Sequence, residues 1–113
     1  MILKTKHKML IAGLAYRPVR FLRRIFRRPS RDTFRRSGFQ WELDLGEVVD
    51  FIIYISGNFE RDVRKFIQRN VKEGDVAFDI GANVGAHSLF MGRCVGQTGH
   101  AYAVEATEYA YNK

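Results

Sequence analysis

The sequence predicts an α/β fold built around parallel strands, and two observations support this prediction. First, an apolar segment at Val76–Ile80 leads into the glycine-containing turn Gly81–Gly85, and a helical pattern follows. Second, another short apolar segment comes after that helix and ends at Glu105. A strand that is followed by a helix and a second strand is the βαβ unit of parallel sheets. The expected strand, crossover helix and strand cover residues 76–80, 86–95 and 100–105.

The turn after the first of these strands has the composition of a site for a nucleoside. Gly81 can adopt backbone angles that a side chain forbids, and Gly85 allows the start of the helix to lie close to the strand and to a ligand. Glu105 stands 26 positions after Asp79, at the end of the second strand. An acid at that position can accept hydrogen bonds from both hydroxyls of a ribose. The pattern therefore predicts half of a nucleoside-binding site.

Charge is distributed unevenly along the 113 residues. Residues 1–36 contain 12 Lys and Arg residues and one acid, Asp32, which gives this segment a charge of +11. Residues 37–113 carry a charge of −4, so the net charge of the chain is +7. The high isoelectric point therefore belongs to an N-terminal basic arm. It is no reason to classify the remainder as a nucleic-acid-binding protein.

The sequence contains no clear pattern for secretion or for a membrane span. No segment approaches the ~18–20 apolar residues that cross a bilayer. Met9–Tyr16 is apolar and follows three lysines, as in a signal peptide, but Arg17 stands where a cleavage site would need small residues. Cys94 is the single cysteine, cannot form an internal disulfide, and is expected to be a small core residue. These observations favour a cytoplasmic location.

The basic arm contains a segment, residues 17–28, with the pattern of an amphipathic helix. Its apolar residues share one side and its arginines the other: Phe21, Leu22, Ile25 and Phe26, and Arg17, Arg20, Arg23, Arg24, Arg27 and Arg28. Pro18 is tolerated in a first turn, Pro29 stops the pattern, and Ser30–Gly38 is expected to be a linker. Opposed apolar and basic faces suit peripheral attachment to the inner face of an anionic membrane through residues 9–28. A solvated basic tail and phosphate binding to nucleic acid remain alternatives.

A strand and a helix are expected between the arm and the parallel strands. Alternating apolar and polar residues over 39–45 predict a half-buried strand, whereas Val48–Ile55 fits either a short helix or a strand. Asn58 can cap a helix over about 59–70. The apolar face of that helix would consist of Phe59, Val63, Phe66 and Ile67. Towards the end of the chain, Thr107 is expected to cap another helix.

These patterns divide the chain into three segments. They are a basic arm and linker at 1–36, a strand and helix segment at 37–70, and the parallel strands with their helix at 71–113. Two parallel strands with one crossover helix cannot cover both faces of a parallel sheet, and a body of about 75 residues buries little surface. We therefore expect the chain to be the front part of a larger domain, truncated within the segment 71–113.

The order of residues from Asp79 to Gly85 resembles motif I of class I S-adenosylmethionine-dependent methyltransferases. Its form here, Asp-Ile-Gly-Ala-Asn-Val-Gly, is similar to that of the FkbM family. The likeness extends over residues 39–113 and includes Gly57-Asn58-Phe59-Glu60, Val71-Lys72-Glu73-Gly74-Asp75 and Gly99-His100-Ala101-Tyr102-Ala103-Val104-Glu105. Asn83 stands where generic methyltransferases often have a third glycine. Ala106 follows the acid where the family often has proline, which changes the stiffness of the loop.

The resemblance implies a Rossmann-like sheet and an enzyme that transfers a methyl group from S-adenosylmethionine to a hydroxyl of a sugar, glycolipid or secondary metabolite. Gly81, Asn83 and Gly85 would line the methionine end of this cofactor. Asp79 would lie under the loop, where it either meets the ligand or caps loop amides, and Glu105 would hold the ribose. The implied reaction is an in-line displacement that depends on positioning. No catalytic base and no metal site is assigned, and a fragment is not expected to be active alone.

Other interpretations compete with this one. The turn Gly81–Gly85 could connect strand and helix without a ligand. An NAD site is disfavoured because dinucleotide sites prefer Gly-x-Gly-x-x-Gly, and Asn83 and Ala86 interrupt that spacing. His87 is expected to pack or to face solvent rather than to act as a base. The alternative functions are an RNA methyltransferase that grips its substrate with the basic arm, and an inactive fragment whose amphipathic arm binds a membrane surface.

Overall fold

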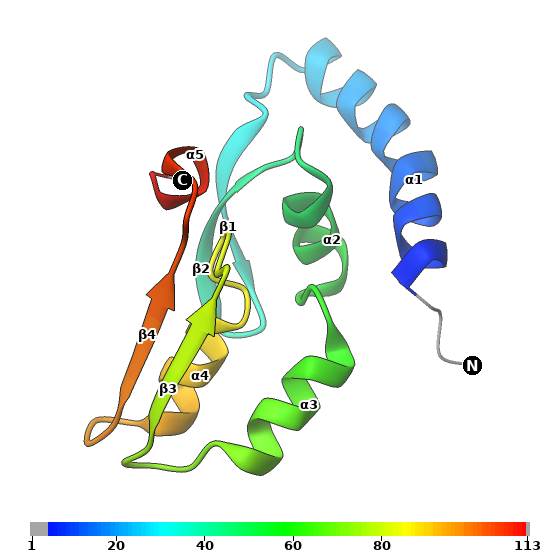
Figure 1. Ribbon diagram of the computed structural model, residues 1–113. Helices are drawn as coiled ribbons and strands as arrows, with labels where there is room; N and C mark the ends of the chain where they lie inside the picture. Colours follow the sequence, from blue (N-terminus) through cyan, green and yellow to red (C-terminus); the bar gives the residue numbers. More distant parts are fainter. Residues whose placement is uncertain (1–4, 113) are drawn as a thin grey trace. The chain divides into compact units, whose positions relative to one another are not determined.

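The computed structural model describes residues 5–112 and contains two compact units, one that extends to Phe59 and one that begins at Glu60 (Figure 1). The first unit contains α1 (Thr5–Ile25), β1 (Arg31–Arg36), β2 (Phe39–Asp44) and α2 (Val48–Ser56). The second contains α3 (Arg61–Asn70), β3 (Val76–Ile80), α4 (Ser88–Val95), β4 (His100–Val104) and α5 (Glu108–Tyr111). Each unit has its own pair of strands. Neither segment boundary expected from the sequence, after residue 36 or after residue 70, separates the two units, because β1 pairs with β2 and α3 packs on α4.

Helix α1 is longer than the expected helix over 17–28, because it begins at Thr5. Pro18 therefore lies in the interior of the helix and not in its first turn, and its missing N–H removes one intrahelical hydrogen bond. The helix is ended by backbone hydrogen bonds and a left-handed residue. Arg27 has a φ of 51°, and the N–H of Arg28 donates to the carbonyl of Arg23 at 2.8 Å. These are features of a Schellman motif, which ends the helix before Pro29 is reached.

The prediction of a linker over Ser30–Gly38 is wrong, because residues 31–36 form strand β1. This strand pairs antiparallel with β2, so that Phe34 lies opposite Trp41. Ser37 and Gly38 have φ values of 52° and 78°, as the two central residues of a type I′ hairpin turn require. Phe34 is the only large apolar residue of β1, so the sequence shows no apolar alternation there. The strand expected over 39–45 is confirmed as β2.

The core of the first unit is formed by β2 and α2. The segment Val48–Ile55, for which the sequence pattern allowed a helix or a strand, is helical. Its buried apolar side chains are Trp41, Leu43, Leu45, Phe51, Ile52 and Ile53. Asp50 is fully buried in α2, and its Oδ2 accepts a hydrogen bond from the N–H of Asp44 at 2.8 Å. A buried carboxylate is tolerated where it is hydrogen-bonded, and this one links the beginning of α2 to the end of β2.

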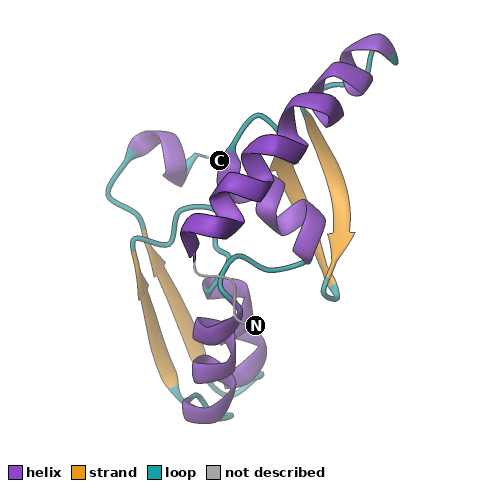
Figure 2. Ribbon diagram, turned by 90° about the vertical axis from the view of Figure 1, so that its right-hand side faces the viewer, coloured by secondary structure: helices purple, strands orange, loops and turns teal. Residues whose placement is uncertain are grey.

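The second unit contains the expected βαβ arrangement and is a small α/β structure. Strands β3 and β4 are parallel, with Val76 beside His100 and Phe78 beside Tyr102. Helix α4 packs on both strands, and α3 packs on α4, so both helices lie on one side of the strands (Figure 2). The buried side chains between them include Ile67, Phe90 and Val95. The other face of the strands consists of exposed apolar residues. This is expected for a parallel pair that has helices on one side only, because no element covers the second face. They are Val76, Phe78, Ile80, Tyr102 and Val104.

The ends of the helices in this unit differ partly from the expectations. Glu60 is the N-cap residue of α3, so Asn58 is not the cap and Phe59 lies outside the helix. Ile67 is 2% exposed, whereas Phe66 is 66% exposed, so the buried face of α3 is narrower than expected. Helix α4 begins at Ser88, two residues later than expected. The capping role of Thr107 is confirmed, because its hydroxyl accepts the N–H of Ala110 at 3.3 Å.

Candidate functional site

The turn Gly81–Gly85 lies at the carboxyl ends of β3 and β4. The N–H groups of Gly81 and Ala82 both donate to the carbonyl of Val104, at 2.8 and 3.0 Å. These bonds fasten the beginning of the turn to the last residue of β4. Because the strands are parallel, the turn after β3 and Glu105 after β4 meet at the same edge of the pair. Residues that are more than twenty positions apart in the sequence are thereby brought into contact.

The backbone of the turn has three residues in the left-handed region. The φ values of Gly81, Asn83 and Gly85 are 83°, 49° and 75°. Glycine adopts this region without strain, and asparagine does so more readily than most other residues. No heavy atom lies within 4 Å of the position that a Cβ of Gly81 would occupy, so the space beside this residue is open. This open space would admit a ligand close to the backbone.

Gly85 differs from its expected role. The nearest atoms to a Cβ at this position would belong to Ser88, at 3.9 Å, which is ordinary van der Waals contact. A close approach of helix and strand therefore does not require glycine here. The positive φ does, and the N–H of Gly85 donates to the carbonyl of Ala82 at 2.8 Å, which closes the turn.

Glu105 accepts hydrogen bonds from the turn after β3 and from a residue of the segment after β4. Its Oε1 accepts the N–H and the hydroxyl of Thr107, at 2.9 and 2.8 Å, and its Oε2 accepts the N–H of Asn83 at 2.9 Å. Each of these bonds favours the ionised carboxylate. Together, those from Thr107 foremost, they lower the pKa of Glu105 below its ordinary value of 4.5. The side chain is therefore an oriented anion at neutral pH.

The hydrogen bonds of Glu105 limit how it can hold a ribose. A carboxylate offers about four acceptor positions, and the bonds from Thr107 and Asn83 use three of them. The N–H of Ala106 also interacts favourably with the carboxylate, so these positions all have a partner. A ribose hydroxyl would therefore have to share or replace one of these hydrogen bonds. Thr107 thus takes part in the site, although the sequence indicated it only as a helix cap.

Asp79 lies beneath the turn and is bonded to the next helix. Its carboxylate is buried, and its Oδ2 accepts the hydroxyl of Ser88 at 2.6 Å. Because Ser88 is the first residue of α4, this bond fixes the beginning of the helix to the end of β3. Within residues 5–112 no amide of the turn donates to Asp79, so the expected capping of loop amides is not observed. The sequence did not single out Ser88; its only local signal is a hydroxyl in the first turn of a helix.

The remaining candidate residues, His87 and Cys94, lie outside the turn. The Nε2 of His87 lies 3.5 Å from Oε2 of Glu60, which precedes α3. Cys94 is half-buried in α4. Among residues 5–112, no group of three His, Cys, Asp or Glu side chains could hold a metal ion, and no helix has both the length and the apolar character that a bilayer span requires. Chemically, the turn and Glu105 together offer a carboxylate, a rigid backbone and open space.

No family model matches the sequence, and no curated protein or solved structure matches it. A function for this chain is therefore proposed from the residues of the site and from their geometry.

Proposed function

We propose that this chain binds S-adenosylmethionine and provides the cofactor-binding part of an O-methyltransferase. The observation that supports this most strongly is the hydrogen bond between the N–H of Asn83 and the carboxylate of Glu105. It joins a glycine turn and a strand-end acid at the carboxyl edge of parallel strands, which is where open α/β sheets bind their ligands. The second support is the resemblance of the segment Asp79–Gly85 to motif I of the FkbM family. The parallel pair β3–β4 is compatible with the Rossmann-like sheet of that class.

Different residues of the site would contact different parts of the ligand. Glu105 would accept a ribose hydroxyl, which would share or replace one of the hydrogen bonds from Asn83, Ala106 and Thr107. The backbone of the turn would contact the methionine part, with the closest approach at Gly81, where no side chain is in the way. Asp79 would act indirectly, because its bond to Ser88 holds the turn between β3 and α4 in place.

S-adenosylmethionine carries a methyl group on a sulfonium, which is electrophilic without further activation. The contribution of this chain would be to orient the ligand and to exclude water from one side of it. The acceptor class that fits the resemblance is a hydroxyl of a sugar, a glycolipid or a secondary metabolite. We assign no catalytic base within residues 5–112. We also propose a cytoplasmic location for this reaction.

An NMR titration of the 113-residue chain with S-adenosylhomocysteine, the demethylated product, tests the proposal. Because the chain is expected to hold half of the site, binding is expected to be weak, and the amide signals of Gly81, Asn83, Gly85 and Glu105 are expected to shift together at millimolar ligand. Glu105→Gln removes the charged acceptor, and a hydrogen bond to a charged group is stronger than one to a neutral group, so the Kd is expected to rise about tenfold or more.

Glu108→Gln is the matched control for this titration. It removes the same charge three residues further along the chain, on the exposed surface of α5. The Kd of this variant is expected to equal that of the unaltered chain. Failure of the four amide signals to shift at millimolar ligand, or an equal loss of affinity in both variants, would reject the proposed site.

A further inference from the structure

Among the side chains of helix α1 that the structure describes, those that contact the rest of the first unit lie on one side. The ring of Tyr16 packs edge-on against Phe51, with the ring centroids 5.7 Å apart, and its hydroxyl donates to the carbonyl of Gly46 at 3.3 Å. Val19 is half-buried on the same side. Arg23, also half-buried there, donates to the carbonyl of Pro29 at 2.7 Å. This side of the helix is therefore its docking side within the unit.

The opposite side of α1 is apolar and exposed. Leu14 is 70% exposed, Phe21 is 65% exposed and Ile25 is 56% exposed. At about 100° per residue these positions lie roughly opposite Tyr16 on the helix surface. Other large apolar side chains extend the same exposed surface: Leu10, Ile11 and Leu22. An exposed apolar surface on this scale indicates an interaction site.

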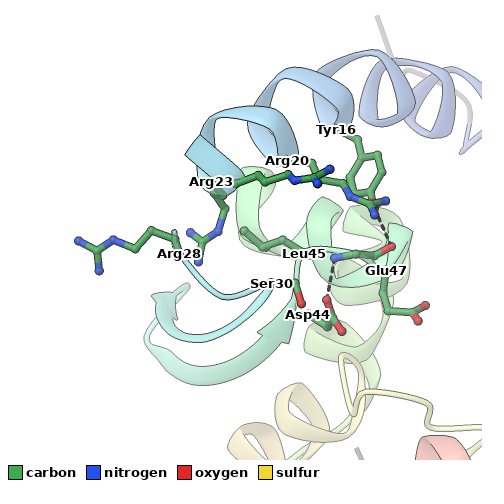
Figure 3. Close-up of a pocket in the computed structure, with 10 residues that line it drawn as sticks. Tyr16, Arg20, Arg23, Arg28, Ser30, Asp44, Leu45 and Glu47 are labelled. Atoms are coloured by element: carbon green, nitrogen blue, oxygen red, sulfur yellow. Dashed lines mark hydrogen bonds between the residues drawn. The ribbon is translucent and has the colours of Figure 1, made fainter. Parts of the chain in front are cut away.

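Arg24 and Arg28 border this apolar surface. Four arginines line a cavity of about 490 Å³ on the docking side of the helix, between α1 and the segment 44–47 (Figure 3). The arginines of the cavity are Arg20, Arg23, Arg24 and Arg28. Figure 3 shows Arg28 extending outward from the end of the helix. Arg20 donates to the hydroxyl of Tyr16 at 3.0 Å. Within residues 5–112, the guanidinium groups of Arg24 and Arg28 have no hydrogen-bond or ion-pair partner.

Arg24 and Arg28 can meet an anion at the border of the apolar surface. The cavity itself suits an anion less well, because Asp44 and Glu47 also line it, and the hydrogen bond from the N–H of Gly46 to Oδ1 of Asp44, at 2.8 Å, does not remove the charge of that carboxylate. The uncommitted guanidinium groups of Arg24 and Arg28 present planar sets of donors, which match the oxygens of a phosphate group.

We propose that α1 binds the surface of an anionic phospholipid membrane. Its exposed apolar side enters the boundary between headgroups and acyl chains, and Arg24 and Arg28 bind lipid phosphates beside it. The helix lies in the plane of the surface, because it is not apolar enough to cross a bilayer. This inference is independent of the proposed cofactor site, since all of its residues belong to the first unit.

Two other occupants fit the observations less well. A nucleic acid would use the arginines but would leave the apolar surface around Phe21 in water. A second copy of the chain would cover the apolar surface but would bring two sets of arginines close together, which is unfavourable. A membrane with anionic headgroups satisfies both the apolar and the basic parts of the surface.

Flotation of the full chain with vesicles tests the proposal. The chain is expected to float with vesicles that contain phosphatidylserine, and not with phosphatidylcholine alone. The double variant Arg24→Glu/Arg28→Glu is expected to weaken vesicle binding about tenfold or more, because each basic residue near an anionic surface contributes to attraction. Phe21→Ser/Ile25→Ser is expected to weaken it as well, because the inserted apolar area is lost. Binding is expected to fall as salt is added.

Each variant has a matched control on α3. Arg61→Glu/Arg69→Glu makes the same change in net charge at exposed positions, and Phe66→Ser removes an equally exposed aromatic ring. Both controls are expected to float like the unaltered chain, and the circular dichroism of all variants is expected to show the same helix content.

Four results would overturn the proposal. The first is absence of flotation with phosphatidylserine vesicles, and the second is an equal loss of flotation in the variants and their controls. The third is binding of an RNA oligonucleotide that Arg24→Glu/Arg28→Glu abolishes while the unaltered chain ignores vesicles. The fourth is a dimer that Phe21→Ser/Ile25→Ser dissociates while vesicle binding is unaffected.

Discussion

Alanine substitutions at three glycines of the second unit distinguish two effects on the free energy of unfolding. One is the strain of a left-handed backbone conformation, and the other is the collision of a new Cβ with neighbouring atoms. Gly81 has a φ of 83° and open space where a Cβ would lie, so Gly81→Ala introduces conformational strain and no collision. The left-handed region costs a residue with a side chain about 1–2 kcal/mol. Alanine also reduces the freedom of the unfolded chain, which offsets part of that cost. We expect Gly81→Ala to lower the free energy of unfolding of this unit by about 1 kcal/mol.

The other two glycines provide the comparison. Gly92 lies within α4 and also has nothing within 4 Å of a Cβ position, so Gly92→Ala is expected to stabilise the unit by about 0.5–1 kcal/mol. A Cβ at Gly99 would lie 2.7 Å from the carbonyl oxygen of Val95 and would also collide with the carbonyl oxygen of Asp75. These backbone atoms cannot move aside freely, because both accept hydrogen bonds at the junction with β4. Gly99→Ala is therefore expected to cost about 3 kcal/mol.

Native-state amide hydrogen exchange, followed by NMR at residues of β3 and α4, measures the free energy of opening of this unit. Amides of the first unit serve as an internal reference, because all three substitutions lie in the second. The expected order of stability is Gly92→Ala above the unaltered chain, then Gly81→Ala, then Gly99→Ala. Equal stabilities of Gly81→Ala and Gly92→Ala would refute the left-handed turn at the candidate site. A Gly99→Ala variant no less stable than Gly81→Ala would refute the close approach at Gly99.

Two further predictions concern acidic residues. The folded-state pKa of Glu105 is lowered, chiefly by the hydrogen bonds from Thr107, so its contribution to stability is fully present above the unfolded-state value near 4.5 and is lost as pH falls through the folded-state pKa. Hydrogen exchange at decreasing pH should show this loss in the unaltered chain and not in Glu105→Gln, and a carboxyl ¹³C titration midpoint of 4.5 or higher for Glu105 would contradict it. Asp50→Ala is expected to destabilise the first unit by about 1–3 kcal/mol, because the N–H of Asp44 loses its partner. Urea unfolding followed by the fluorescence of Trp41 measures this effect, and a midpoint equal to that of the surface control Asp62→Ala would argue against it.

The parallel strands and the turn between them were predictable because their signals are local. An apolar run of strand length, glycines and an asparagine that tolerate a positive φ, and a threonine before a helical segment all act over a few residues. Strand β3 has the bounds that the pattern indicated, and Thr107 caps α5. Such features are properties of the chain itself, so they are visible without knowledge of the partner elements.

The first unit was less predictable because its elements depend on partners that are distant in the sequence. Strand β1 contains one large apolar residue, Phe34, and it is a strand because the turn at Ser37 and Gly38 folds it onto β2. Asn58 has a good capping side chain, yet α3 begins after Glu60. In both places the tertiary arrangement prevailed over a weak local preference.

The sequence by itself determined the order of elements in the second unit, the positive-φ turn after β3 and the acid that follows β4. The tertiary structure alone decided that Glu105 is bonded to Asn83 and Thr107, that Asp79 is bonded to Ser88, and that the apolar side of α1 is exposed. The physical reason is that periodicity records which side chains are apolar, whereas burial depends on which surface is available to cover them. Tyr16 packs against Phe51, so the side of α1 that carries Tyr16 faces the unit and the opposite, apolar side faces water.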